Sequence, residues 1–181
     1  FRPNSSILAS GSWNSIKLWG QDGTLVDTVE KAHDRVVSSL NFSSDQALLA
    51  SAGQDIDQKT KKSIAKIKLW RIGSNKILPV ATLATQSTAI TSIEFVPQHA
   101  LLASVGEDGI IRFWRYFKEQ DKPGKSRRLK GEYQYFNGDQ GQLTSIRFNP
   151  QGTLMLTTSK ALNDRNGSIQ RNGLVKLWKL E

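Results

Sequence analysis

The stretch LASVGEDGIIRFW, residues 102–114, decides the fold because it holds two strand-like segments separated by a turn. In the matching segment at 16–19, Ile16 and Leu18 alternate with Lys17 and Trp19. That alternation is the period of a β-strand, in which successive side chains point to opposite faces. The letters Glu-Asp-Gly at 107–109 are typical of a tight turn. The stretch therefore predicts a β-hairpin whose second strand ends in Trp.

This hairpin recurs along the whole chain as part of a longer unit. The four Trp-terminated segments are SIKLW, KIKLW, IIRFW and VKLW, and they follow ILAS, LLASAG, LLASVG and LMLTTS. A segment ending in Phe comes before each hairpin: VVSSLNF (36–42), ITSIEFV (90–96) and LTSIRFN (143–149). A fourth, less regular segment follows Trp: TLVDTVE, ILPVATLA and EYQYF. Because no long stretch shows a helical stripe, we predict an all-β chain of four-stranded units.

The distances between these markers locate insertions. From Phe to Trp they are 18, 28, 19 and 30 residues, so two units hold about ten extra residues between their second and third strands. We predict a partial unit at 1–35, a unit at 36–89 with insertion 56–66, a unit at 90–142 with insertion 117–130, and a last unit at 143–181 with insertion 160–172. Phe1 falls where the other units end their first strand, so we expect the chain to start partway through a unit.

These motifs resemble the repeats of WD40 β-propellers, with LASGS-x-N-S-I-K-L-W at 8–19, LASAGQD…IKLW at 49–70, LASVGEDGIIRFW at 102–114 and VKLW at 175–178. The resemblance implies about four antiparallel blades, the C-terminal portion of a larger ring that we expect to have seven. Since repeats bury their apolar faces only against neighbours, missing N-terminal blades would close the ring. The alternative is that a second copy of the chain closes it.

The phrase KLWGQDGTLVDTVEKAHD at 17–34 is most similar to bacterial, especially cyanobacterial, members of the family. In such members the repeats often form the C-terminal sensor of a STAND-type signalling ATPase. The resemblance therefore implies that this chain is part of such a protein, with any nucleotide chemistry outside the chain.

The family's structural tetrad joins a His, a Ser or Thr, an Asp and the Trp in a buried hydrogen-bonded chain. The resemblance maps a complete set onto the second unit: His33, Ser51, Asp55 and Trp70. The third unit keeps Ser104, Asp108 and Trp114, with Gln86 and Ser87 where the His would be; the first has Ser10, Asn14 and Trp19; the last has Trp178 and Thr158. The Trp-Asp pair that names the family is absent, because Gly20, Arg71, Arg115 and Lys179 follow the four tryptophans.

The net charge of +9 is concentrated in the insertions, where 56–66 carries +3, 117–130 carries +4 and 160–172 carries +2. The resemblance implies that 56–66 and 160–172 share the face that holds the His–Asp end of the tetrad. A basic face could bind an acidic protein segment, nucleic acid or a phosphorylated ligand. The alternative is a set of solvated loops that keep the protein soluble.

The candidate binding face comprises Trp13, Lys59, Lys61, Lys62, Arg165 and Arg171. Trp13 lies in a turn where the family usually has a polar residue, so it could anchor a partner. It could equally pack on a neighbouring loop.

Catalytic constellations are not apparent in the sequence, which has no Cys and only two His. We predict no cofactor, no metal site and no enzymatic activity. The expected function is a protein-interaction scaffold or ligand-sensing module, and the second hypothesis is nucleic-acid binding through the basic loops. No run of eighteen apolar residues occurs, so we expect no membrane partner, and we expect a cytoplasmic location.

Overall fold

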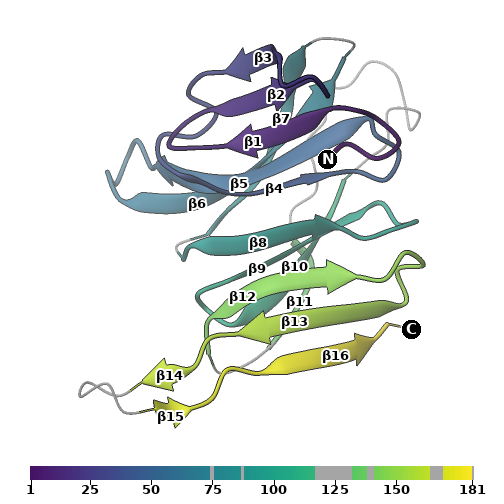
Figure 1. The fold of residues 1–181 in the computed structure, drawn as a ribbon. Coiled ribbons are helices and arrows are strands. Elements are labelled where there is room, and N and C mark those ends of the chain that lie inside the picture. The colour runs from purple at the N-terminus through teal and green to yellow at the C-terminus, as the bar shows by residue number, and fades with distance from the viewer. Residues whose placement is uncertain (74–75, 87, 117–131, 138–140, 164–168, 181) are drawn as a thin grey trace.

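The computed structural model describes residues 1–181 except 74–75, 87, 117–131, 138–140, 164–168 and 181. None of the described residues lies in a helix, and none therefore forms a helix that could span a bilayer. Four antiparallel sheets follow one another along the chain and stack face to face (Figure 1). The prediction of an all-β chain built from repeated sheets is confirmed.

We call the four sheets blades 1 to 4, in chain order. Blade 1 contains β1 (Leu8–Gly11), β2 (Ile16–Trp19) and β3 (Leu25–Val29). Blade 2 contains β4 (Val37–Phe42), β5 (Leu48–Ile56), β6 (Ser63–Ile72) and β7 (Ile77–Gln86). Blade 3 contains β8 (Ile90–Phe95), β9 (Leu101–Gly106), β10 (Ile110–Arg115) and β11 (Glu132–Asn137). Blade 4 contains β12 (Leu143–Phe148), β13 (Leu154–Ser159) and β16 (Val175–Lys179), and a separate hairpin pairs β14 (Leu162–Asn163) with β15 (Ile169–Arg171).

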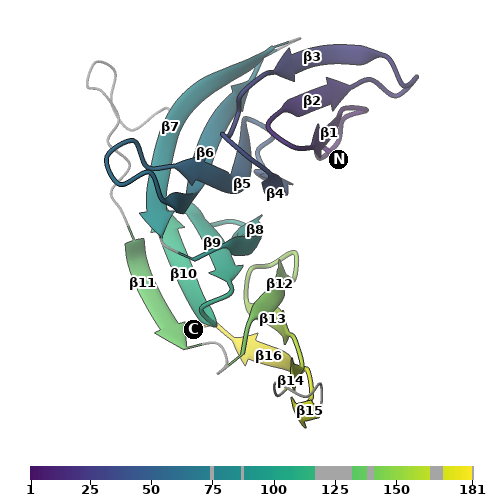
Figure 2. The same cartoon turned by 90° about the vertical axis from the view of Figure 1, so that its left-hand side faces the viewer.

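The blades are arranged as a curved fan. Figure 2 shows β4, β8 and β12 toward the concave side of the fan, while β3, β7 and β11 lie toward its outer side. Each blade is ordered from its inner strand outward along the chain, so the loops at either end of the blades gather on two opposite surfaces.

The core lies between blades rather than within them. In blades 1 to 3, the strand that carries the Trp turns two apolar side chains toward the next blade, which covers them with its own Trp-bearing face. The packed sets are Ile16 and Leu18 against Leu49 and Trp70, Ile67 and Leu69 against Leu102 and Trp114, and Ile111 and Phe113 against Met155 and Trp178. In blade 4 the equivalent Val175 and Leu177 are 69% and 68% exposed.

Hydroxyl groups on the inner strands link successive blades. The Ser38 hydroxyl lies 2.7 Å from the Ile90 carbonyl oxygen of the next blade and 3.3 Å from the Ala52 carbonyl of its own blade. The Thr91 hydroxyl, 53 residues later, lies 2.6 Å from the Leu143 carbonyl oxygen of blade 4 and 3.1 Å from the Val105 carbonyl oxygen of its own blade. In both cases the shorter bond crosses to the neighbouring blade, so the hydroxyl fixes the position of one sheet on the next.

Polar side chains add a second link at the same junctions. The Asn41 side-chain oxygen accepts the Phe95 N–H at 2.9 Å. Glu94 holds the equivalent position and accepts the Phe148 N–H, with Arg147 3.6 Å from its carboxylate. Burial raises the pKa of Glu94 above its usual 4.5, and the Arg147 charge partly offsets that effect.

Nearly half of the predicted insertion 56–66 is strand. Ile56 closes β5 and 63–66 open β6, so the ladder between them gains the pairs Gln54 to Ala65, Asp55 to Ile64 and Ile56 to Ser63. Only residues 57–62 form the turn, where the Asp57 carboxylate accepts the Thr60 N–H at 2.7 Å and its hydroxyl at 2.8 Å. The basic residues of this segment therefore stand on an extended, hydrogen-bonded hairpin.

The outer strand of blade 2 has an irregular register. Leu83 and Val80 are skipped in the pairing of β7 with β6, which places two bulges in β7. The side chain of Leu83 is buried, and Val80 packs against the core between blades 2 and 3. Pro79 lies directly before the first bulge, opposite Trp70.

Replacing Thr91 with Val should lower the free energy of unfolding by about 1 to 3 kcal/mol, because the isosteric change leaves the buried Leu143 carbonyl without its donor. Chemical unfolding of the full chain measures this loss. The matched control is Thr144→Val, since the Thr144 hydroxyl is exposed and bonds to Thr158 of its own blade. Equal losses in both variants would contradict a linking role for Thr91.

Candidate functional site

A chain of buried polar groups lies at one end of blade 2. His33, in the loop between β3 and β4, is fully buried, with its Nε2 atom 2.8 Å from the Ser51 hydroxyl. Trp70 donates its indole N–H to the same hydroxyl at 2.9 Å, and Asp55 lies 3.3 Å from His33 Nδ1. Because a carboxylate can only accept, the proton is on Nδ1, and the Ser51 hydroxyl donates to Nε2. Each polar group of this set thus has a partner.

The Asp55 carboxylate is held ionised by its surroundings. Burial alone would raise its pKa, but hydrogen bonds from His33 and the Asp34 N–H and the charge of Lys68 together hold the pKa of Asp55 well below its usual 3.8. The Asp34 N–H donates at 2.8 Å and the Lys68 Nζ lies 3.2 Å away. These contacts join Asp55 to the loop before β4, so the role of the carboxylate is to hold that loop in place.

Glycine is required beside the His33 ring. A Cβ atom built on Gly53 would lie 2.5 Å from the ring. In blade 3 the same position is Gly106, and a Cβ there would meet the backbone carbonyl of Ala89 instead. Backbone therefore fills in blade 3 the space that an imidazole fills in blade 2.

That difference changes the polar partner of Asp108. The Thr88 hydroxyl donates to the Asp108 carboxylate at 3.0 Å, and Arg112 forms an ion pair with it at 2.8 Å. Sequence reasoning looked for this partner at Gln86 and Ser87 and missed Thr88; Ser87 and the Gln86 side chain lie outside the described residues. Counting residues back from the start of β8 could not reveal Thr88, because the backbone at Ala89 lies close to Gly106 and the loop takes a shorter path there.

The bond between Trp and a hydroxyl recurs in the other blades. Trp114 donates to Ser104 at 2.8 Å and Trp19 to Ser10 at 2.7 Å. In blade 1 Asn14 provides a backbone carbonyl, which accepts the His33 N–H at 3.4 Å. Asn14 thus meets the loop of the next blade through its main chain.

In blade 4 the predicted partner of Trp178 was wrong. Trp178 donates to Thr157 at 2.9 Å, and not to Thr158. Trp178 pairs opposite Met155 in the ladder, so the hydroxyl two residues further on shares its face. Thr158 points the other way and bonds to Thr144 at 2.7 Å.

A basic side chain stands two residues before each Trp, and sequence reasoning missed its role. Lys68 and Arg112 pair with the aspartates of blades 2 and 3. In blade 1 the Lys17 ammonium lies 5.9 Å from the Trp19 ring centroid, and in blade 4 Lys176 lies 5.8 Å from that of Trp178. These distances suit cation–π attraction. The sequence signal for this role is the triplet Lys-Leu-Trp or Arg-Phe-Trp, which recurs in every blade.

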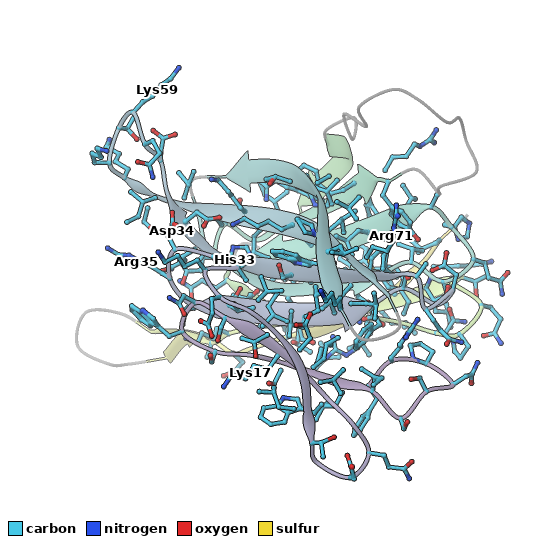
Figure 3. The ribbon with its side chains drawn as sticks, turned by 90° about the horizontal axis from the view of Figure 1, so that it is seen from above. Lys17, His33, Asp34, Arg35, Lys59 and Arg71 are labelled. Carbon is cyan, nitrogen blue, oxygen red and sulfur yellow. The ribbon has the colours of Figure 1, made fainter. Side chains whose placement is uncertain are left out.

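Exposed side chains gather at the same end as His33. Trp13 is 65% exposed in the turn between β1 and β2, and Val36 is 39% exposed in the loop before β4. Figure 3 shows Lys59 at the tip of its hairpin, with Asp34 and Arg35 on the same side of the molecule and Arg71 on the opposite side.

Of the other predicted binding residues, Lys61 and Lys62 lie in the turn 57–62 beside Lys59, and Arg171 ends β15. The hairpin of β14 and β15 projects from the same end of the fan as that of β5 and β6 (Figure 1). Arg165 and the insertion 117–130 lie outside the described residues. Within the described part, no three His, Asp or Glu side chains group as a metal site would require.

Repeated blades that share apolar faces and a Trp–hydroxyl bond define a β-propeller repeat protein. The profile of the WD40 family, described as "WD domain, G-beta repeat", matches residues 23–56, 78–115 and 132–179, which together make up more than half of the chain. The chain belongs to the WD40 repeat family.

Three curated proteins are similar to this chain. "Nuclear distribution protein nudF 1" of Talaromyces marneffei is 29% identical over 63% of the chain and 23% of its own length. "CCR4-associated factor 4 homolog" of Vanderwaltozyma polyspora is 25% identical over 64% of the chain and 16% of its own length. "Protein FIZZY-RELATED 1" of Arabidopsis thaliana is 34% identical over 61% of the chain and 22% of its own length. The chain thus spans less than a quarter of each relative.

Replacing Asp55 with Asn should lower the free energy of unfolding at pH 7 by about 2 kcal/mol, because a buried, paired charge is lost. A depressed folded-state pKa stabilises above the unfolded value of 3.8, and that contribution is lost as the pH falls further. The variant should therefore lose less stability than the wild type between pH 5 and about pH 2. Urea unfolding across this range measures both effects, and parallel pH profiles would exclude the depressed pKa.

Replacing Gly53 with Ala should lower the unfolding free energy by about 1 to 3 kcal/mol, because the added methyl group displaces the His33 ring and breaks its hydrogen bonds. Gly73→Ala is the matched control, since a Cβ there meets its nearest atom at 3.5 Å. Thermal unfolding of both variants makes the comparison. A Gly53→Ala protein as stable as the control would show that the ring can move freely.

Proposed function

We propose that the chain is a non-catalytic protein-interaction scaffold that presents the His33 end of its blades to a partner. The observation that carries this proposal is the contrast at that end between locked and open groups. His33, Asp55 and Asp108 are engaged in hydrogen bonds within the fold. Trp13 and the lysines of the hairpin tip face solvent on a hydrogen-bonded backbone.

A scaffold needs a surface whose backbone does not rearrange when a partner binds. The loop between β3 and β4 meets that need, because the Arg35 N–H donates to Gln54 at 2.8 Å and the Gln54 N–H donates to Val36 at 3.0 Å. On its other side the Val37 N–H donates to the Ser12 carbonyl at 3.0 Å. The loop is therefore bonded to blades 1 and 2 at once.

We further propose that this scaffold is part of a larger, seven-bladed ring in which other blades cover its two end faces. The exposed Val175 and Leu177 of blade 4 hold positions that each other blade buries. At the opposite end, a hollow of about 770 Å³ lies over Trp19 and Leu8, where blades 2 and 3 each have a neighbour. The units 1–35, 36–89, 90–142 and 143–181 would then be consecutive blades.

The alternative is a second copy of the chain that covers the same faces. In a closed ring, the inner strand of the next blade would supply Thr144 with a carbonyl like those that Ser38 and Thr91 reach.

The parent protein and the cellular location are further parts of the proposal. A place in a bacterial STAND-type signalling ATPase is supported only by the resemblance of residues 17–34, and the relatives above are fungal and plant proteins. The cytoplasmic location likewise stays a prediction from the sequence.

Lysine-reactive cross-linking of the full-length protein in its native cells tests the scaffold proposal. Lys59, Lys61 and Lys62 should cross-link to another polypeptide, because they are exposed at the hairpin tip that we propose faces the partner. Lys76 is the matched control, since it is exposed in the loop between β6 and β7, at the other end of blade 2. Cross-links confined to the parent polypeptide would contradict an interaction role for this end.

A further inference from the structure

We infer that the His33 end binds an acidic peptide segment that carries one aliphatic or aromatic side chain. The surface consists of Trp13, Arg35, Val36 and the hairpin tip with Lys59, Lys61 and Lys62, and we call it the Trp13 surface. This inference rests on the proposed scaffold function and adds the chemistry of the partner.

An apolar anchor point is present on a fixed backbone. The turn that carries Trp13 is held at Ser12, whose carbonyl accepts the Val37 N–H, and at Asn14, whose carbonyl accepts the His33 N–H. Large aromatic side chains contribute most of the free energy at many interfaces, especially where ordering them costs little entropy. A partner that covers the indole of Trp13 and the side chain of Val36 would therefore gain most from an apolar residue.

The charges around this anchor are unbalanced toward positive. Asp55 is paired with the Lys68 ammonium, while Asp34 and Asp57 accept the neutral N–H groups of Ile56 and Thr60, which leave two negative charges at this surface. The four cations of the surface outnumber these two carboxylates, and none of the ion pairs in the described part of the chain involves Arg35, Lys59, Lys61 or Lys62. Carboxylates on a partner would complement them.

The two parts of the surface lie at a distance that a short peptide can span. The Arg35 and Val36 backbone is bonded to Gln54, and Lys59 lies five residues further along the hairpin. At about 3.3 Å per residue, the tip stands roughly 15 Å beyond the anchor. An extended segment of about six residues therefore reaches from Trp13 to the lysines, with its apolar residue at one end and its acidic residues along the hairpin.

A peptide explains the surface better than a nucleic acid. Single-stranded nucleic acids are bound by several aromatic side chains that stack on successive bases. Trp13 is the one exposed aromatic residue of the Trp13 surface, and its exposed neighbour Val36 is aliphatic. This arrangement suits one apolar side chain followed by negative charges.

Fluorescence anisotropy with labelled probes tests the inference on the full chain. The probes are the peptide Leu-Gly-Asp-Glu-Asp-Glu, the same peptide with Ser in place of Leu, and a single-stranded oligonucleotide. We expect the Leu peptide to bind and the Ser peptide to bind at least tenfold more weakly. We expect Trp13→Ala to weaken the Leu peptide by at least tenfold and Trp13→Phe to retain most of the affinity.

Charge variants test the second half of the surface. Lys59→Gln combined with Lys62→Gln should weaken the Leu peptide about tenfold and reduce its dependence on salt. The matched control combines Lys76→Gln with Lys179→Gln, two exposed lysines away from the Trp13 surface, and should bind within twofold of the wild type. Circular dichroism of each variant confirms that the blades remain folded.

The outcomes separate this inference from the scaffold proposal. Binding of the oligonucleotide that Trp13→Ala leaves unchanged, together with equal binding of the Leu and Ser peptides, would replace the inference with a general polyanion surface. Failure of both peptides, while the tip lysines still cross-link to a partner in cells, would overturn the peptide chemistry and leave the scaffold role standing. If neither peptide binds and the tip lysines do not cross-link to a partner, both the inference and the scaffold proposal are overturned.

Discussion

No blade of this protein can bury its apolar faces on its own, and the rest of the structure depends on that constraint. Ile67 and Leu69 are buried only because blade 3 lies over them, while Val175 and Leu177 hold the same positions in blade 4 and remain exposed. Stability therefore resides at junctions, as expected of repeat proteins. The hydroxyls of Ser38 and Thr91 add direction to this packing, because each aligns one inner strand on the next.

Buried interactions also determine the structure of the end that we propose binds a partner. Its buried polar set fixes a loop through Asp55 and His33, and that loop in turn fixes the turn that carries Trp13. Where the full set is missing, other groups take over: Thr88 serves Asp108, and lysine ammonium groups lie against the rings of Trp19 and Trp178. Rigid presentation of exposed side chains is thus a consequence of buried hydrogen bonds.

The strands could be predicted because Phe and Trp mark their ends and apolar residues alternate between them. The details of the site could not. Thr88 lies near Asp108 because the backbone at Ala89 approaches Gly106, which is a tertiary effect without a sequence period. The extension of β5 and β6 was hidden because the lysines of 56–66 suggest a loop. By contrast, Thr157 was accessible from a careful alignment of LMLT with LLAS, since ladder register selects its face.

The outer strand of blade 2 has one further consequence. A long strand at the rim of a sheet offers unpaired backbone groups on which another chain can polymerise, and such edges promote amyloid-like aggregation. In β7 the bulges at Val80 and Leu83 break the regular spacing of these groups, and Pro79, directly before the first bulge, has no N–H to donate. The ten residues of β7 therefore make a poor template for cross-β growth.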